Sequence, residues 1–534
     1  MFHQLTTPIG GSLLPTFLVG VLPIVTVLLM LGVLRRPGWQ AGLAGLAVGL
    51  LVAIFGWQFP VRLAFDAVAL GAVLAVWPVM WVVVAAIFVF NMTIRAGRLD
   101  AFRVWILDNV PNDRRVVLVV VGFLFGSLLE AVAGTGTPIA ITSALLVTLG
   151  FPVLDALVFM LIFDTVPVAF GAMGLPITVL AAVTGHPASE LGQMAGRQLP
   201  IFAFLLPFYV LAIYGGWRSL RAVWPLALVA GGSFAATQFV VSNFLSFAIC
   251  DVLASVVAIL VTMTFLRFWR PAADPAFEVN IDRSKITRNN VTGRQSWYPW
   301  LIVAVVATVW TAANLGKIGE YALPWPGLHK EVFITVYQKA YPAVWSFQPL
   351  TTGTALLAAG LIAAWVMGLS AKEFLGAARD TLRQTAIPVA TVAMIIGLAY
   401  LMNYSGVTYS LGLGIVAVGP VWFPFLSAFL GWIAVFLTGS DTSGNALFGN
   451  MQVVAANQLG LSPTLMAATN STGGVFGKMI SPQSIACGVA TTGMQGREGQ
   501  IVARTFKHSI FLTLLLGVLV WLQQHYFHWM IPGP

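Results

Sequence analysis

The sequence predicts an all-α polytopic membrane protein, and three features of the chain support this fold class. Of the 534 residues, 59% are hydrophobic and 8% are charged, whereas about 25% of the residues of an ordinary soluble domain are charged. Many apolar stretches reach or exceed the ~20 residues that a helix needs to cross a bilayer. Polar, glycine-containing segments interrupt these stretches twice in each half of the chain, at 128–140, 163–177, 436–450 and 470–484.

The chain divides into two membrane halves, 1–268 and 298–534, joined by the polar segment 269–297, which we expect to be cytoplasmic. We expect about 12 to 14 membrane-crossing segments in total. The apolar runs that predict them cover residues 12–34, 41–57, 63–94, 116–150, 153–183, 199–214, 223–240, 244–266, 300–313, 349–367, 387–403, 421–437 and 508–530. Pro78 predicts a kink in the run 63–94.

The basic residues predict the topology. Arg35 and Arg36 follow the first apolar run, while the segment before that run has no Lys or Arg. By the positive-inside rule, the N-terminus is expected outside the cell. The rule also places two further basic loops in the cytoplasm, one at 95–115 and one that contains Lys372, Arg379 and Arg383. The aromatic-rich segment 317–346 is expected to be an extracellular loop.

The net charge of +9 is explained by these loops, and no basic patch with interleaved aromatic residues predicts a nucleic-acid partner. The two cysteines, Cys250 and Cys487, lie in apolar segments without metal-ligand spacing. The six histidines fall mostly outside the four broken segments. We therefore expect no metal, no cofactor and no histidine-based proton site. The larger loops contain no catalytic cluster, so an integral membrane enzyme is not expected either.

The broken segments are the candidate functional elements. Irregular backbone survives within a bilayer only where it is buried in protein or lines a cavity. A helix that ends there exposes free N–H groups and the positive end of its dipole, which suit an anion. Residues 439–445 (GSDTSGN) offer such groups together with hydroxyls. Small residues that allow close helix packing are the alternative explanation, but packing does not account for Asp441. Pairs of broken helices in two halves are typical of secondary transporters with a central site.

Ionisable residues inside spans are costly and usually face a cavity or a partner. A carboxyl group in a dry site can carry a proton, because burial disfavours its charged form. Glu130, one turn before a glycine break, is the first candidate proton carrier. Lys478 is the one basic residue within the four broken segments, and it would either bind a substrate carboxylate or neutralise Asp441 or Glu130 as an ion pair. The further intramembrane candidates are Asp164, Asp251 and Asp441, whereas Asp66 and Asp155 lie nearer to predicted span ends.

Several runs resemble the bacterial L-lactate permease family. They are LLEAVAGTGTPIAI, PVAFGAMGLPI, GRQLP, MNYSG, FLTGSDTSGNALFG and GKMISPQSIA, and they are spread over nearly the whole chain. The resemblance implies a proton-coupled importer of L-lactate in the bacterial plasma (inner) membrane, often also accepting D-lactate and glycolate. It also implies an ion-transporter-like fold with two inverted repeats of broken helices or re-entrant hairpins, compatible with an elevator motion.

The resemblance places the site on residues of the broken segments. The expected proton-coupling residues are Glu130, Asp164 and Asp441. The expected substrate-binding residues are Gly134, Thr135, Gly136, Thr137, Phe170, Gly171, Tyr404, Ser440, Asp441, Thr442, Asn445, Asn470, Ser471, Lys478, Ser481 and Gln483. In the expected mechanism, helix N-termini and hydroxyls hold the substrate carboxylate, while Glu130 with Asp164 or Asp441 takes the proton. The sequence leaves the proton-to-substrate ratio and the oligomeric state open.

Two positions depart from the family pattern. Asp164 stands where family members usually have Asn, and Ala248 stands where they tend to have Glu. A relocated proton site, a compensating exchange of charge and a changed substrate range are the three explanations, and we hypothesise that Asp164 takes over part of the proton coupling. Two alternatives to a lactate–proton symporter remain: a sodium-coupled carboxylate or dicarboxylate transporter, and an anion channel built from the glycine-rich segments.

Overall fold

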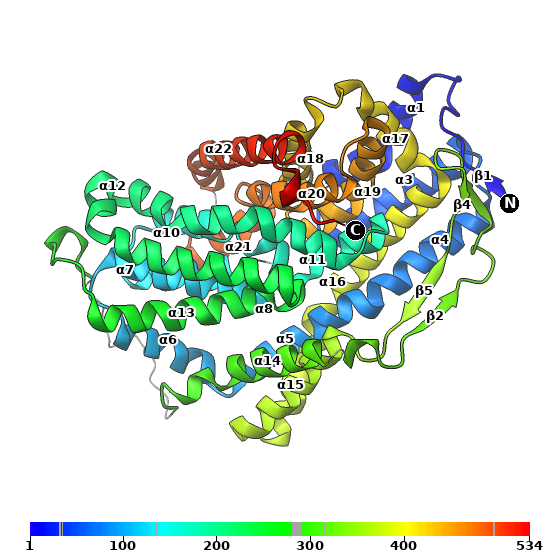
Figure 1. Ribbon diagram of the computed structural model, residues 1–534. Helices are drawn as coiled ribbons and strands as arrows, with labels where there is room; N and C mark the ends of the chain where they lie inside the picture. Colours follow the sequence, from blue (N-terminus) through cyan, green and yellow to red (C-terminus); the bar gives the residue numbers. More distant parts are fainter. Residues whose placement is uncertain are drawn as a thin grey trace.

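The structure is a computed structural model that describes residues 1–30, 34, 36–134, 136–279, 291–313, 315–494 and 497–533. Most of this chain is helical (Figure 1). The helices of the first half are α1 (Leu13–Gly20), α2 (Leu22–Leu28), α3 (Gly38–Leu51), α4 (Val61–Leu74), α5 (Trp81–Arg95), α6 (Arg98–Asn109), α7 (Arg114–Val117), α8 (Gly126–Ala133), α9 (Thr137–Thr148), α10 (Val153–Phe163), α11 (Gly171–Thr184), α12 (Ala188–Phe244) and α13 (Cys250–Phe268).

The second half is also mainly helical. Its helices are α14 (Tyr298–Ala312), α15 (Thr352–Met367), α16 (Ala371–Ser405), α17 (Val407–Ile415), α18 (Phe423–Thr438), α19 (Asp441–Leu459), α20 (Pro463–Lys478), α21 (Pro482–Thr492) and α22 (Glu498–His525). Short π-helical and 3₁₀ turns join some of them, including η2 (Val52–Gly56), η3 (Ala75–Met80), η4 (Leu118–Phe125), η5 (Val168–Phe170) and η6 (Phe247–Ile249).

The predicted class of fold, a polytopic helical membrane protein, is confirmed. Within the described residues, seven helices are long and apolar enough to cross a membrane, or eight if the bent pair α10–α11 counts as one span. Shorter apolar helices such as α9, α15 and α18 add to these. The 57-residue α12 leaves helical geometry at Gly215, Gly216 and Val223. The total of 12 to 14 crossings and the inverted repeats remain predictions.

Several predicted spans are found with small shifts in their ends. The predicted kink at Pro78 is confirmed, because Trp77 has an extended backbone (φ −136°, ψ 119°) between α4 and α5. The two arms of α12 pack face to face, with Gly231 of the second arm against the backbone of Phe204 in the first. The first predicted span is two short helices, α1 and α2, that meet at Val21.

Three segments that we predicted as loops have regular structure, and two of them, the basic ones, are helical. The segment with Lys372, Arg379 and Arg383 forms the first turns of the 35-residue α16, which begins at a capping box of Ser370 and Glu373. Segment 95–115 contains α6. Charged side chains had suggested a loop in both cases, but an exposed helical turn solvates them equally well.

Segment 317–346 contributes most of the strands. β2 (Tyr321–Pro324) pairs antiparallel with β5 (Val344–Phe347), and β3 (Val332–Ile334) pairs antiparallel with β4 (Lys339–Ala340). The N-terminal β1 (Phe2–His3) adds in parallel to β3. The N-terminus and segment 317–346 therefore lie together at one end of the molecule (Figure 1).

Three of the four predicted breaks lie where the sequence places them. α8 and α9 are separated at Gly134 and Gly136, whose φ angles of 59° and 80° favour glycine. α10 and α11 meet at a bend of 63°. Gly439, with φ 70°, separates α18 from α19.

The prediction for segment 470–484 is wrong for its first part. α20 stays helical through Lys478, and the break is confined to the residues before α21. Gly473 and Gly477 instead face α18, where a Cβ atom would clash with the carbonyl oxygens of Ala428 and Trp432. In these two places the glycines serve close helix packing, the alternative considered above.

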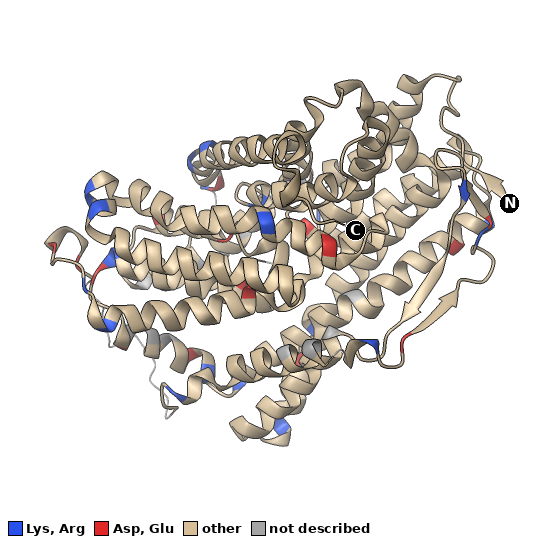
Figure 2. Cartoon of the chain, in the orientation of Figure 1, with Lys and Arg blue, Asp and Glu red and all other residues tan. Residues whose placement is uncertain are grey.

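The charged residues lie mostly at helix ends and in connecting segments, while the helix centres are largely uncharged (Figure 2). The continuous helix formed by α7, η4 and α8 is the clearest case of a buried span, because its apolar window is completely enclosed by protein. A helix that is apolar on all sides belongs in such an interior. It delivers Glu130 to the centre of the molecule.

Candidate functional site

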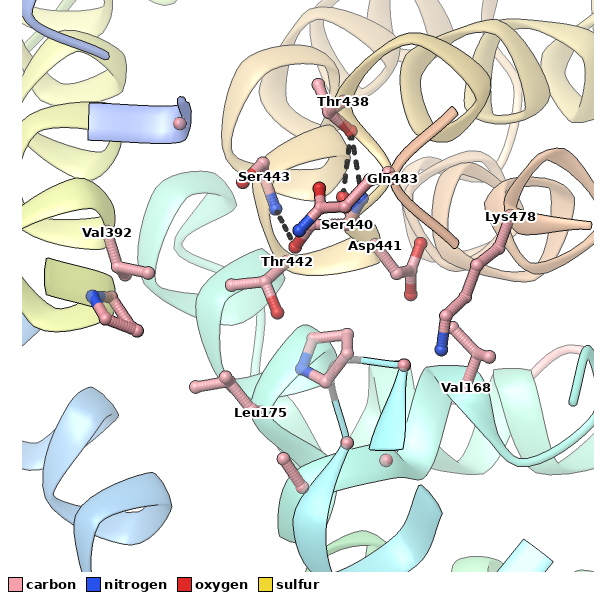
Figure 3. A pocket seen from close by; sticks show the side chains of 18 of the residues that line it. Val168, Leu175, Val392, Thr438, Ser440, Asp441, Thr442, Ser443, Lys478 and Gln483 are labelled. Carbon is pink, nitrogen blue, oxygen red and sulfur yellow. Dashed lines mark hydrogen bonds between the residues drawn. The ribbon is translucent and has the colours of Figure 1, made fainter. Parts of the chain in front are cut away.

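The broken helices of both halves surround a cavity of about 290 Å³ that is lined by both polar and apolar residues. Figure 3 shows Asp441 and Lys478 reaching toward it from two different helices. Its polar lining comes from the ends of α8, α9, α18, α19, α20 and α21: Glu130, Gly134, Gly136, Thr438, Gly439, Ser440, Asp441, Thr442, Ser443, Lys478, Gln483, Ser484 and Cys487. Ligand pockets usually measure ~300–1,000 Å³, so this cavity suits a small molecule.

Lys478 forms two buried ion pairs across the cavity wall. Its Nζ lies 2.7 Å from Oε1 of Glu130 and 3.0 Å from Oδ2 of Asp164. All three side chains are buried, with exposed fractions of 6% or less. Lys478 comes from the last turn of α20, Glu130 from α8, and Asp164 from the bend between α10 and α11. Of the two roles predicted for Lys478, the geometry corresponds to the ion pair.

Asp441 is a third buried carboxyl at the cavity. Its Oδ2 accepts a hydrogen bond of 2.5 Å from the Ser471 hydroxyl and a longer one of 3.5 Å from the Asn445 amide. Its Oδ1 has no hydrogen-bond partner within the described part of the chain. The second oxygen of Glu130, Oε2, is likewise without a donor there. Buried carboxylate oxygens without partners are costly, so these atoms are where a proton or a ligand donor would be stabilised.

Three helix N-termini converge on the same cavity. Gly136, Ser440 and Ser481 are the N-cap residues of α9, α19 and α21. The Ser440 and Ser481 hydroxyls accept hydrogen bonds from the backbone N–H groups of residues 443 and 484. The first N–H groups of a helix have no partner within it, and together with the helix dipole they favour an anion.

A network of buried amides fixes the geometry of the C-terminal half of the site. Asn445 donates to the carbonyl oxygen of Pro176 in α11 and accepts from Asn470 in α20. Gln452 donates to Asn470 and is hydrogen-bonded to Ser427 of α18. Satisfied polar networks of this kind specify a single arrangement of their helices. Asn445 and Asn470 therefore hold α11, α18, α19 and α20 together and do not line the cavity.

The side of the cavity opposite the charged groups is mostly apolar and belongs to α16. This wall consists of Ile387, Pro388, Thr391, Val392 and Ile395, and Figure 3 shows Val392 facing the polar cluster. No motif in the sequence marked these residues, because they form part of an ordinary apolar span. Ser443, Ser484 and Cys487 were also missed, although each lies within seven residues of a predicted site residue.

The backbone beside the cavity is strained. Ala172, Met173 and Gly174 have φ angles of 43°, 59° and 74° at the start of α11. Left-handed non-glycine residues cost ~1–3 kcal/mol each and concentrate at functional sites, where surrounding structure holds them. Ala172 lies against Gly134 of the first broken pair. The two breaks of the N-terminal half therefore support each other.

The structure brings together most of the predicted site residues. Glu130, Gly134, Gly136, Gly171, Ser440, Asp441, Thr442, Lys478 and Gln483 line the cavity, and Asp164 and Ser471 bond to residues that line it. Ser481 caps α21. Thr135 lies outside the described residues, and the side chain of Thr137 is not described.

Besides Asn445 and Asn470, two further predicted substrate-binding residues lie outside the cavity lining. The Tyr404 hydroxyl donates to the carbonyl oxygen of Pro342, and its ring stacks on Tyr341 with 4.2 Å between centroids. Phe170 is buried in the apolar core. Neither residue belongs to the cavity lining, because a position within a motif does not determine which way the side chain points, and their roles in substrate binding stay predictions. Asp66 and Asp155 pair with Arg62 and Arg504 at helix ends, as expected.

Broken helices that surround a partly open cavity with buried charged groups, between two halves of a polytopic chain, define a membrane transport protein of the secondary transporter type. A family model described as L-lactate permease matches residues 16–527. The chain belongs to the L-lactate permease family.

Relatives from two bacteria align with this chain over nearly their whole length. The chain is 39% identical to glycolate permease GlcA of Escherichia coli, with 99% of each chain covered. It is 37% identical to an L-lactate permease of Bacillus subtilis over 99% of each chain, and 39% identical to an L-lactate permease of Escherichia coli over 98% of each. Among solved structures, the YdaH transporter of Alcanivorax borkumensis gives a TM-score of 0.46 at 16% identity, covering 88% of this chain and 89% of that one.

Proposed function

We propose that this protein imports L-lactate together with protons across the bacterial inner membrane, and that it also accepts D-lactate and glycolate. Its relatives named L-lactate permease and glycolate permease support small 2-hydroxy acids as substrates. The small cavity with converging helix N-termini fits the same class of ligand. The orientation with the N-terminus outside is part of the proposal and rests on the charge of the loops.

The balance of charge around Lys478 is the observation that carries proton coupling. Among the described residues at the site, one ammonium group faces three buried carboxyl groups, those of Glu130, Asp164 and Asp441. If all three carboxyls were ionised, the site would carry excess negative charge and would repel a lactate anion. Protonation of one carboxyl halves this excess of negative charge, and protonation of two removes it. Proton uptake is therefore a condition for anion binding.

The substrate carboxylate binds in this scheme at the N-terminal ends of α19 and α21. The first-turn N–H groups that the Ser440 and Ser481 caps leave open, and the hydroxyls of Thr442 and Ser443, supply hydrogen bonds. Lys478 contributes when protonation of Glu130 or Asp164 weakens one of its ion pairs. The apolar wall of α16 accommodates the small carbon chain. A loaded site with less net charge crosses the bilayer at lower cost.

A dicarboxylate is a less suitable substrate for this cavity. Two carboxylates would need more cationic contacts than the single ammonium group of Lys478, which is already shared between two acidic side chains. A sodium-coupled dicarboxylate transporter therefore remains the second candidate, and uptake that requires sodium would support it. An anion channel would differ from either carrier because it would not show saturable counterflow.

Uptake of labelled L-lactate into proteoliposomes tests the proposal. An inward proton gradient without sodium should drive accumulation above the equilibrium level, and a protonophore should abolish it. Unlabelled glycolate and D-lactate should compete, whereas succinate should not. Uptake that requires sodium, or flux that shows no counterflow, would contradict the proposal.

A further inference from the structure

A buried carboxyl group behind the site is not used in this mechanism. Asp251, in the first turn of α13, is 1% exposed. Its Oδ1 accepts a hydrogen bond of 3.0 Å from the Gln238 amide of α12, and its Oδ2 has no partner within the described residues. No Lys, Arg or His of the described chain forms an ion pair with it, in contrast to Glu130 and Asp164.

Asp251 lies next to the helix that carries Glu130. α13 packs against α8 and η4 as well as against α12, and Asp251 stands in the first turn of α13. The other titratable group that faces Asp251 is its neighbour Cys250, while α12 presents the neutral Gln238. A carboxyl with no cation and an unsatisfied oxygen is stabilised by taking up a proton.

Further polar groups continue from Asp251 in both directions. Ser127 lies one turn before Glu130 in α8, and Ser255 and Thr262 follow Asp251 on one face of α13 at helical spacing. All three side chains are 2% exposed or less, and their hydroxyls have no hydrogen-bond partner within the described part of the chain. Unsatisfied buried polar groups are the usual places for internal water.

This face of α13 is therefore a polar stripe within an apolar span. At 1.5 Å per residue, Asp251 to Thr262 covers about 16 Å along the helix. The stripe leads from the first turn of α13 toward the end of this helix at Phe268. In the simple packing of an apolar helix these positions would be filled by aliphatic side chains, since each unpaired buried hydroxyl costs ~1–3 kcal/mol.

We propose that Ser127, Asp251, Ser255 and Thr262 form a proton path that connects Glu130 with the side of the protein where α13 ends at Phe268. The proton of the Glu130 carboxyl passes to the Asp251 carboxylate, through the Ser127 hydroxyl or a water molecule bound to it. Glu130 becomes a carboxylate and Asp251 a neutral acid. Asp251 then releases the proton to water held along Ser255 and Thr262, and its carboxylate is regenerated.

The path assigns separate roles to the two acids. Glu130 couples the proton to the substrate at the cavity, while Asp251 carries it away without touching the substrate. The inference rests on the proposed proton symport. It adds that the proton leaves by a route different from the one that the substrate takes through the cavity, so substrate exchange does not need Asp251.

The variant Asp251→Asn tests this separation. It keeps the size of the side chain and its place beside Gln238 but cannot take up a proton. Exchange of external for internal lactate at equal pH should stay within about twofold of the unmodified protein, whereas gradient-driven uptake should fall at least about tenfold, in line with the loss of a positioned proton-transfer group. Thr264→Val is the matched control, because its exposed hydroxyl in α13 bonds only to the Leu260 carbonyl oxygen in the described contacts.

The ratio of gradient-driven uptake to exchange decides the outcome. A lowered ratio in Asp251→Asn supports the path, and an unchanged ratio overturns it. A parallel loss of uptake and exchange leaves the ratio unchanged and therefore also overturns the path. If Asp251→Asn does not fold, the double variant Ser127→Ala, Ser255→Ala is judged by the same ratio, since it removes two hydroxyls that have no partner to lose. Absence of gradient-driven uptake in the unmodified protein would instead refute the proposed symport itself.

Discussion

The Lys478 ammonium and the Glu130 carboxyl lie 2.7 Å apart although 348 positions separate them in the chain. Each residue comes from a broken segment of a different half, and the contact closes one side of the cavity. Removing one partner of a buried ion pair leaves an uncompensated buried charge. The contact therefore links the stability of the fold to the chemistry of the site, and the first prediction tests this link.

Lys478→Met should destabilise the protein by ~3–5 kcal/mol, because it leaves Glu130 and Asp164 next to each other without a cation. Thermal unfolding of the purified protein in detergent measures this loss. The triple variant with Glu130→Gln and Asp164→Asn should recover much of the stability but should not transport lactate. A single variant that unfolds like the unmodified protein would show that the two ion pairs do not form.

Asp164→Asn should alter proton coupling while leaving the fold intact. The amide oxygen can still accept a hydrogen bond from Lys478, which preserves the fold, but the side chain carries no charge, which alters the coupling. We expect a changed proton-to-lactate ratio and a changed pH dependence of uptake in proteoliposomes. Asp66→Asn is the control, since Asp66 lies at the start of α4 beside Arg62, away from the cavity. An unchanged ratio and pH dependence would end the hypothesis that Asp164 shares in coupling.

Ser471→Ala should weaken lactate transport by removing the hydrogen bond of 2.5 Å to Asp441. Hydrogen bonds to charged groups contribute ~1.5–3 kcal/mol, so the KM for lactate should rise about tenfold or more. Ser471→Thr keeps the hydroxyl and should stay near the original value. Thr505→Val, which removes a hydroxyl bonded only to its own helix in the described contacts, controls for general effects. Equal KM values in all variants would show that Asp441 does not contribute to substrate binding.

Cys487 should be a natural reporter of the cavity. Its thiol lines the cavity, whereas Cys250 is fully buried elsewhere. A small, membrane-permeant methanethiosulfonate reagent should inhibit uptake, and saturating lactate should slow the inhibition. Cys487→Ser should be active and resistant to the reagent. Inhibition of this variant, or labelling that lactate does not slow, would place the substrate away from the α21 end of the cavity.

Gly473→Ala should destabilise the protein by ~1–3 kcal/mol, the typical cost of overpacking. The added methyl group would clash with the backbone of Ala428 in α18. Gly499→Ala in α22 is the matched control, because no heavy atom lies within 4 Å of its added Cβ, and it should be neutral or slightly stabilising. Comparison of the two midpoints of thermal unfolding checks this. Equal midpoints would show that α18 and α20 are not in close contact.

Three of the four broken segments, and the end of the fourth, were predictable because glycine, proline and hydroxyl residues are easily recognised in an apolar sequence. The exact course of the backbone was not. Gly473 and Gly477 resemble Gly134 and Gly136 in the sequence, yet the first two lie within a helix and the second two in a turn with positive φ. Small residues satisfy both requirements, so only the neighbouring helix distinguishes them.

By itself the sequence determined the class of protein, the family, the approximate spans and the set of intramembrane charges, because each depends on composition or on local pattern. The tertiary structure decided which charges meet. It paired Lys478 with Glu130 and Asp164, directed Asp441 toward Ser471, and turned Tyr404 away from the cavity. It also supplied the apolar wall of α16. Contacts between distant segments depend on how whole helices pack, and the identity of a residue at one position carries no record of its partner across the cavity.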